Sequence, residues 1–157
     1  MEMNNSELIA ASRQQVWDAL NDPEILKQAI PGCEELEMET PTNLKAKVKV
    51  KIGPVKATFN GEVELSELNP PESYRISGSG KGGVAGFASG HADVRLEDVP
   101  EGTMLHYDVK ADVGGKLAQL GSRLIDSTAK KLAGQFFSNL SEIVAPTAED
   151  EEAEASS

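Results

Sequence analysis

The feature that most constrains the fold of this chain is a strict alternation of apolar and polar residues in its middle. From Lys45 to Ile52 every second residue is apolar and the others are lysines. After Gly53-Pro54 the alternation resumes from Val55 to Leu65. A period of two residues places alternate side chains on opposite faces of a strand. The two runs therefore predict a β-hairpin with one apolar face and one solvent-exposed face.

Further strand patterns lie on both sides of this hairpin. They are short runs of apolar and β-branched residues bounded by turn residues such as Asn69-Pro70-Pro71 and Glu101-Gly102. We predict these strands at Ser6–Ala11, Tyr74–Ser77, Gly86–Leu96 and Thr103–Val113. The expected sheet is an antiparallel meander of six to seven strands.

Two short helices are expected after the first strand. Ser12 can cap a helix over Arg13–Leu20, whose apolar residues recur at spacings of three and four. Asp22 can cap a second helix over Glu24–Ile30, which ends before Pro31-Gly32.

The period becomes helical after Gly114-Gly115. From Lys116 to about Val144, apolar residues recur at threes and fours: Leu117, Leu120, Leu124, Leu132, Phe136, Leu140 and Ile143. Such a stripe must be buried, and the concave face of a curved sheet is the surface available to cover it. We therefore predict an α+β helix-grip fold over residues 1–145, in which a curved antiparallel sheet wraps around a long carboxy-terminal helix.

Charge and composition narrow the classes of function. Residues 146–157 are expected to be a disordered acidic tail, because acidic side chains lie there among Ala and Ser with nothing to bury. The net charge of −11 argues against nucleic-acid binding, which needs clustered Lys and Arg. The sequence shows neither a secretory leader nor the roughly 18 apolar residues of a membrane span. We expect a cytoplasmic protein whose membrane contact is peripheral and transient.

The glycine-rich segment Gly78–Gly86 invites comparison with a phosphate-binding loop. Such a loop ends in Gly-Lys-Ser/Thr and leads into a helix. Here Phe87 follows and the next pattern is a strand, so nucleotide binding is not expected. The alternatives are a flexible hairpin whose glycines supply positive φ angles, and a mobile loop that carries Val84 and Phe87 at the mouth of a cavity.

Residues that commonly perform catalysis occur without the partners they need. The two histidines, His91 and His106, are expected on separate strands, with no Cys or carboxylate at a metal-ligand spacing. No serine or cysteine nucleophile motif accompanies them. Cys33 is the single cysteine, which excludes an intramolecular disulfide and fits a reducing compartment. We expect Cys33 to be a small buried side chain, and we predict neither a catalytic site nor a metal site.

Small residues interrupt the helical stripe: Ala118, Gly121, Ser122, Ala129, Ala133 and Gly134. They leave space for a pocket or allow close approach of helix and sheet, and composition leaves both open. With 4% aromatic residues, a pocket would be lined mainly by aliphatic side chains and would suit a lipid-like molecule. From their positions on apolar faces and on the glycine-rich loop, the candidate ligand-binding residues are Trp17, Phe59, Phe87, Leu117, Leu120, Leu124 and Phe136.

Five motifs occur in order along the chain. They are VWDALNDP at Val16–Pro23, IPGC at Ile30–Cys33, KIGPVKA at Lys51–Ala57, GKGG at Gly80–Gly83, and GGKLAQLGSRLI at Gly114–Ile125. Together they resemble the family of the carbon monoxide dehydrogenase G subunit, over a range from about Glu7 to Phe137. That family belongs to the START-like polyketide-cyclase superfamily, which implies a helix-grip fold and a hydrophobic cavity.

The resemblance also implies a function. It points to a non-catalytic accessory protein of a carbon monoxide dehydrogenase-type molybdenum hydroxylase, located at the inner face of the cell membrane. The implied roles are recruitment of the enzyme to the membrane, or carriage of a respiratory quinone such as menaquinone, or another lipid, in the cavity. No covalently bound cofactor is expected. Some relatives end in an apolar anchor, whereas this chain ends in acidic residues, which favours a soluble carrier or a transient adaptor.

Two other classes of function remain open. One is a cyclase- or hydratase-type enzyme, which needs an ionisable side chain pointing into the cavity. The apolar face predicted for Lys45–Leu65 contains none. The other is a structural adaptor that binds no ligand, and it requires a core that is packed solid.

Overall fold

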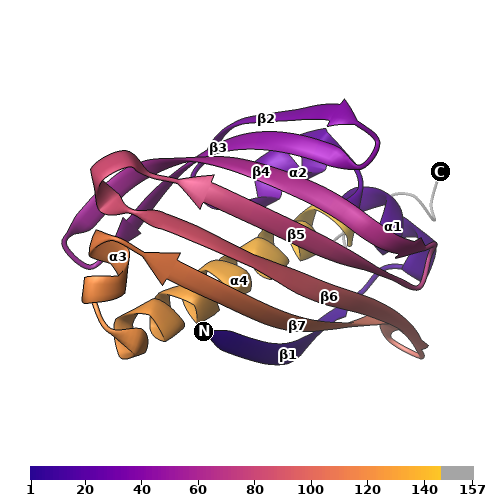
Figure 1. Ribbon diagram of the computed structural model, residues 1–157. Helices are drawn as coiled ribbons and strands as arrows, with labels where there is room; N and C mark the ends of the chain where they lie inside the picture. The colour runs from indigo at the N-terminus through magenta and orange to yellow at the C-terminus, as the bar shows by residue number, and fades with distance from the viewer. Residues whose placement is uncertain (146–157) are drawn as a thin grey trace.

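An antiparallel sheet curls around a long helix in the computed structural model, which describes residues 1–145 (Figure 1). The elements in chain order are β1 (Glu2–Ile9), α1 (Arg13–Leu20), α2 (Pro23–Ala29), β2 (Cys33–Thr40), β3 (Asn43–Ile52), β4 (Val55–Asn69), β5 (Ser73–Lys81), the 3₁₀ turn η1 (Gly83–Ala85), β6 (Phe87–Val99), β7 (Gly102–Gly114), α3 (Lys116–Gln119) and α4 (Ser122–Val144). The predicted α+β helix-grip fold, with two short helices after the first strand, is confirmed.

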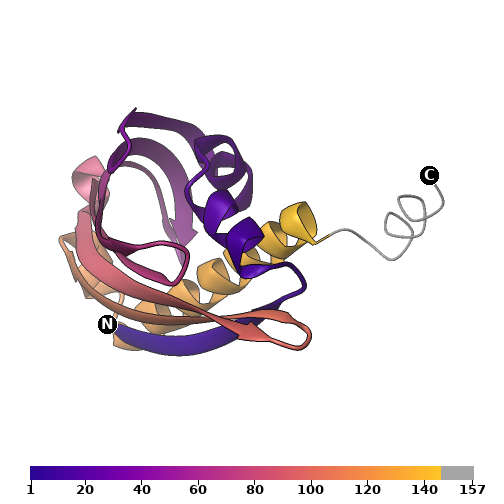
Figure 2. The same ribbon diagram turned by 90° about the vertical axis from the view of Figure 1, so that its right-hand side faces the viewer.

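The sheet has seven strands in the order β1-β7-β6-β5-β4-β3-β2, and every neighbouring pair is antiparallel. The β3–β4 hairpin predicted from the alternation is present, paired from Asn43–Glu64 to Ile52–Val55. Strand β1 closes the other side of the sheet by pairing with β7, so the first and last strands of the chain are neighbours. This topology curves the sheet far enough to cover α4 on several sides (Figure 2).

Several predicted strand boundaries are wrong. Strand β1 runs from Glu2 to Ile9 instead of from Ser6 to Ala11, because Glu2 and the residues after it pair with β7. Strand β5 continues through its glycines to Lys81, because β4 and β6 supply backbone partners on both sides. Strand β2 lies at the edge of the sheet opposite β1, and no strand was predicted for its residues.

The prediction of one helix from Lys116 to Val144 is also wrong. Gly121 has φ +89°, which breaks the helix into α3 and α4. A positive φ interrupts the regular helical backbone, and glycine adopts it without a steric penalty. The long element inside the sheet is therefore α4 alone. The predicted acidic tail, residues 146–157, lies outside the described residues.

Buried apolar residues form a main cluster near α1 and a smaller group near η1. The main cluster includes Ile9, Val16, Leu105 and Leu140, each with no exposed surface. Ala85, Leu117 and Ile125 are buried outside it. In Figure 2, α1 and α2 lie beside the carboxy-terminal half of α4, whereas η1 and α3 lie near the other end. Ligand space inside the sheet must therefore be sought among the residues of the main cluster, which lie between the sheet and α4.

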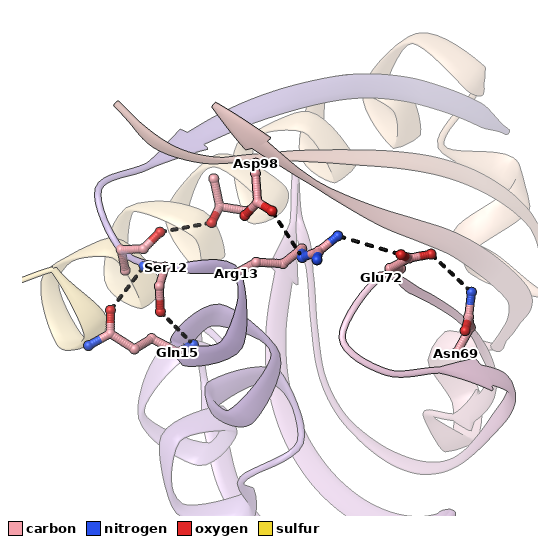
Figure 3. Close-up of polar contacts among 8 residues, drawn as sticks. Ser12, Arg13, Gln15, Asn69, Glu72 and Asp98 are labelled. Carbon is pink, nitrogen blue, oxygen red and sulfur yellow. Dashed lines mark hydrogen bonds and ion pairs between the residues drawn. The ribbon is translucent and has the colours of Figure 1, made fainter. Parts of the chain in front are cut away.

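The start of α1 is held in place by polar contacts (Figure 3). The Ser12 hydroxyl accepts a hydrogen bond from the Gln15 amide at 3.2 Å, and the Gln15 side chain accepts one from the Ser12 amide at 2.9 Å. This reciprocal capping box satisfies two amides at the helix start. Arg13 forms ion pairs with Glu72 at 3.7 Å and Asp98 at 3.5 Å. The helix that covers the main cluster is thus tied to the turns between strands.

Candidate functional site: an apolar cavity

A cavity of about 380 Å³ lies between the concave face of the sheet and α4. Its volume falls within the range of small-molecule pockets. The sheet contributes Met3, Leu36, Leu44, Ala46, Val63, Leu65, Tyr74, Ile76, Ala92, Val94, Leu105, Tyr107 and Val109. The helices and the segment after α2 contribute Leu20, Leu26, Ile30, Pro31, Leu132, Ala133, Phe136 and Phe137.

The cavity follows from the local sequence of the strands and of α4. The alternation in β3 and β4 turns Leu44, Ala46 and Val63 toward α4. On the facing side Ala133 lies between bulkier residues and leaves room. Of the six small residues considered in the helical region, Ala133 is the one that lines the cavity, and Gly134 is exposed. Composition left pocket and close packing as alternatives, and here a pocket is present.

Two tyrosine hydroxyls are the polar side-chain groups of this lining, which contains no Asp, Glu, His, Lys or Arg. Burial raises the pKa of Tyr74 far above its ordinary value. The pKa of Tyr107 is also raised, first by burial and then by the charge of Glu7, while the Asn5 side chain acts in the opposite direction. Both hydroxyls therefore stay protonated at neutral pH. Each can donate a hydrogen bond to an acceptor on a ligand.

Aromatic contacts hold the ring of Tyr107 in place. Tyr107 packs on Phe137 with ring centroids 4.9 Å apart, and Phe137 meets Phe136 at 5.1 Å. The interplanar angle of the second pair is 74°, an edge-to-face arrangement that aromatic rings favour. The strand β7 and the helix α4 are thus joined through side chains that also form the cavity wall.

A groove between β3 and α4 adjoins the cavity. Pro31 and Leu132 line both the groove and the cavity. The groove also carries three lysines, Lys49, Lys51 and Lys131. Helix α2 contacts β2 and α4 beyond one end of this groove, so the sheet and α4 are bridged there. Pro31 and Leu132 therefore stand between the groove and the cavity.

The seven predicted ligand-binding residues are not gathered in one place. Phe136 lines the cavity, and Leu124 lines the adjoining groove. Trp17 is buried behind the cavity wall, where its ring contacts Tyr74.

The other four lie toward η1, outside the lining of this cavity. Phe59 lies against Gly82, and Leu117 belongs to the smaller buried group near η1. Leu120 is half-buried in the break after α3. Phe87 is on the outer face of the sheet by strand alternation, with its ring over Gly114. Whether any of the seven contacts a ligand stays a prediction.

Neither tyrosine is among the ligand-binding residues predicted from the sequence. Tyr74 lies two residues before Ile76 in β5, and Tyr107 lies two residues after Leu105 in β7. In each pair both side chains therefore face the cavity side of the sheet. The same period of two that identified the β3–β4 hairpin therefore contained the signal for both.

The histidines lie on the outer face of the sheet. His106 Nδ1 is 2.7 Å from Ser6 Oγ, and its Nε2 is 3.1 Å from Glu97 Oε1. These contacts among Ser6, His106 and Glu97 lie on an exposed surface, away from the apolar cavity. Cys33, expected to be buried, is half-buried, and burial is the main cause that raises the pKa of its thiol. Within residues 1–145, no group of three or more His, Cys, Asp or Glu is placed to hold a metal ion.

None of the helices in residues 1–145 combines the length and apolar character needed to cross a bilayer.

Solved structures share the fold described above. A conserved protein from Geobacillus kaustophilus is 32% identical, with a TM-score of 0.87, and the alignment covers 92% of this chain and 95% of that one. A protein from Chromobacterium violaceum is 16% identical with a TM-score of 0.72, covering 94% and 99%. A Streptomyces aromatase/cyclase is 14% identical with a TM-score of 0.61, covering 92% and 93%. The last two establish the shared START-like fold alone.

A comparison with sequence families gives a more specific result. No curated protein matches the chain significantly. The sequence profile of the G subunit of carbon monoxide dehydrogenase (CoxG) matches residues 6–145, which include all the elements that form the cavity apart from the start of β1. The chain belongs to this carbon monoxide dehydrogenase CoxG family.

Proposed function

We propose that this protein is a non-catalytic accessory protein that holds an apolar molecule in the cavity between the sheet and α4. The observation that carries the proposal is a cavity of about 380 Å³ whose lining is hydrocarbon apart from two tyrosine hydroxyls. Burying roughly 300 Å² of apolar ligand surface contributes about 7 kcal/mol before the costs of association and ordering. That contribution can offset part of the cost of withdrawing a lipid-like molecule from a bilayer.

The ligand class that fits best is a respiratory quinone such as menaquinone. Its isoprenoid chain suits the aliphatic side chains of the lining, and a ring carbonyl can accept a hydrogen bond from the Tyr74 hydroxyl. Tyr74 is 3% exposed, so this donor lies inside the protein and away from competing water. A bound quinone would supply the capacity to accept and release electrons. The protein's own part is to enclose the ligand and orient its ring.

The family membership supplies the proposed partner. A carbon monoxide dehydrogenase-type molybdenum hydroxylase oxidises its substrate and must pass the electrons on. Carriage of a quinone between that enzyme and the membrane would link the two. A transient contact at the membrane surface is sufficient for this role.

A cyclase-type enzyme is the competing function, because aromatase/cyclases share this fold. Acid–base catalysis in the cavity would have to use Tyr74 or Tyr107, since the lining has no carboxylate, imidazole or amine. Raised tyrosine pKa values make both residues poor general bases near neutral pH. The cavity is better suited to holding a molecule than to transforming it.

The test is native mass spectrometry with lipid extraction on protein purified from its own host, combined with menaquinone titration. Ala133→Phe fills the cavity, and Ser138→Leu adds bulk on the exposed face of α4 as the matched control. We expect a quinone or lipid in the wild type and in Ser138→Leu, and at least tenfold weaker menaquinone binding in Ala133→Phe. Equal binding by all three proteins, or no bound lipid in any, would contradict the proposal.

A further inference from the structure

Two exposed apolar side chains lie at the η1 end of the molecule, Val84 in the turn itself and Phe87 with its ring over Gly114. Val84 is 86% exposed and Phe87 is 52% exposed. Val84 lies within η1, and Phe87 begins β6 directly after it. Gly83 has φ +60°, and a side chain there would meet nothing within 4 Å, so this side of the turn faces open space while Ala85 anchors its other side in the interior. Exposed apolar side chains gathered on one turn indicate an interaction surface.

Lysines outnumber carboxylates at this end of the molecule, where Asp112 and Asp126 are the nearest acidic residues on β7 and α4. Residues 44–61, 73–92 and 113–125 contain no Asp or Glu. Figure 1 shows that the β3–β4 tip, η1, α3 and the start of α4, which these three segments supply, meet at one end of the molecule. Lys51, Lys56, Lys81 and Lys116 lie in these segments, and each is exposed. We call Val84, Phe87 and these four lysines the basic apolar end.

The rest of the chain has the opposite character. The net charge is −11 although this end is basic, so negative charge is concentrated elsewhere. The other end of the sheet carries Glu72 and Glu101 in its turns and Asp98 near the end of β6. A protein with this distribution is oriented by a negatively charged surface, because one end is attracted and the other is repelled.

We propose that the basic apolar end docks on an anionic phospholipid surface, with Val84 and Phe87 entering the headgroup region and the lysines contacting lipid phosphates. This inference rests on the proposed function and adds the surface through which the ligand is exchanged. The groove beside the cavity carries Lys49, Lys51 and Leu124 and reaches Gly53 at the β3–β4 tip. Docking at this end therefore places the groove next to the bilayer, so that a lipid-like ligand has a short path to Leu132.

The test is co-sedimentation of the full chain with phosphatidylcholine vesicles prepared with or without phosphatidylglycerol. We expect binding to the anionic vesicles, little binding to the neutral ones, and loss of binding at high salt. Val84→Ser should lower the fraction bound several-fold. The double variant Lys51→Glu with Lys116→Glu should lower the vesicle affinity by more than about tenfold, because both attractive charges become repulsive.

Matched controls come from elsewhere on the surface. Leu68→Ser removes a side chain that is 42% exposed at the opposite end of β4, and Arg95→Glu reverses an exposed charge on the outer face of β6. Both controls should bind anionic vesicles as the wild type does. Absence of vesicle binding by the wild type would overturn the proposal, as would equal losses in the controls. Loss of dehydrogenase binding in Val84→Ser without any vesicle binding would assign the surface to a protein partner instead.

Menaquinone titration without vesicles separates this proposal from the proposed function. Val84→Ser leaves the cavity lining unchanged, so its menaquinone affinity should equal that of the wild type. A protein that binds anionic vesicles but no quinone would contradict the ligand, and one that binds quinone but no vesicle would contradict the docking surface.

Discussion

The ring of Trp17 meets the ring of Tyr74 edge-on, with centroids 5.1 Å apart and planes at 71°. Trp17 comes from α1 and Tyr74 from the start of β5, so this contact joins the helix to the sheet. Tyr74 in turn lines the cavity. The packing of α1 therefore determines where the most deeply buried polar group of the site lies, although Trp17 itself stands behind the cavity wall.

Replacement of Trp17 should destabilise the fold. Trp17→Ala removes a large side chain that is 6% exposed, and we expect the free energy of unfolding to fall by about 3–5 kcal/mol. Trp17→Phe keeps an aromatic ring against Tyr74 and should cost about half as much. Urea denaturation followed by circular dichroism measures both losses. Equal stability of Trp17→Ala and Trp17→Phe would show that the contact with Tyr74 contributes nothing.

Loss of the Tyr74 hydroxyl should weaken quinone binding without loosening the fold. Tyr74→Phe removes the proposed hydrogen bond, worth about 1 kcal/mol, so the menaquinone Kd should rise about fivefold. Quenching of the fluorescence of Trp17, the single tryptophan, provides the measurement. Tyr107→Phe removes the other hydroxyl of the lining, which also lies near Asn5 and Glu7 of β1, and should raise the Kd less than Tyr74→Phe does. An unchanged Kd in Tyr74→Phe would remove Tyr74 from the ligand site.

Stability at alkaline pH should depend on Tyr74. Burial raises the pKa of Tyr74, so the folded protein keeps this proton while the unfolded chain releases it near pH 10. Below that pH, both states are protonated and the full stability is present. Above it, the free energy of unfolding declines with each further rise in pH, until the folded state also ionises.

Tyr74→Phe cannot ionise and should show a smaller decline between pH 10 and the alkaline limit of the fold. Thermal unfolding midpoints measured at increasing pH check this, with Tyr107→Phe as the comparison. Parallel curves for the wild type and Tyr74→Phe would mean that the unfolded and folded states release this proton at the same pH.

Much of the fold could be predicted because short stretches of sequence indicate the same strand or helix that the folded protein contains. The β3–β4 alternation and the Ser12 capping signal are local, and both appear in the structure. Strand β2 was missed although Leu36 and Met38 alternate with glutamates, because the run is short and glutamate is a poor strand former. Its pairing with β3 supplies the order that its own sequence does not.

The candidate site was harder to predict than the fold, because the spacing of apolar residues shows which side chains are buried but not where space between them is left unfilled. Phe136 and Leu124 lie on neighbouring faces of α4, so a stripe drawn from spacing contains both the cavity wall and the groove. The break at Gly121 also rotates the register of α3 relative to α4. Sequence spacing across that break cannot show that Leu117 belongs to a separate buried group.

Two glycines should respond in opposite ways to replacement by alanine. Gly32 has φ +76°, and a Cβ there would lie 2.1 Å from the Lys49 carbonyl oxygen. The Lys49 amide donates to the Gly32 carbonyl at 2.8 Å, so the two backbones cannot separate without loss of this bond. Gly32→Ala should therefore cost at least about 2 kcal/mol of stability.

Gly134 lies within α4, and a side chain there would meet nothing within 4 Å, so Gly134→Ala should add about 0.5–1 kcal/mol. Urea denaturation compares the pair, and a loss in both variants would show that helix α4 does not tolerate a methyl group at its exposed face.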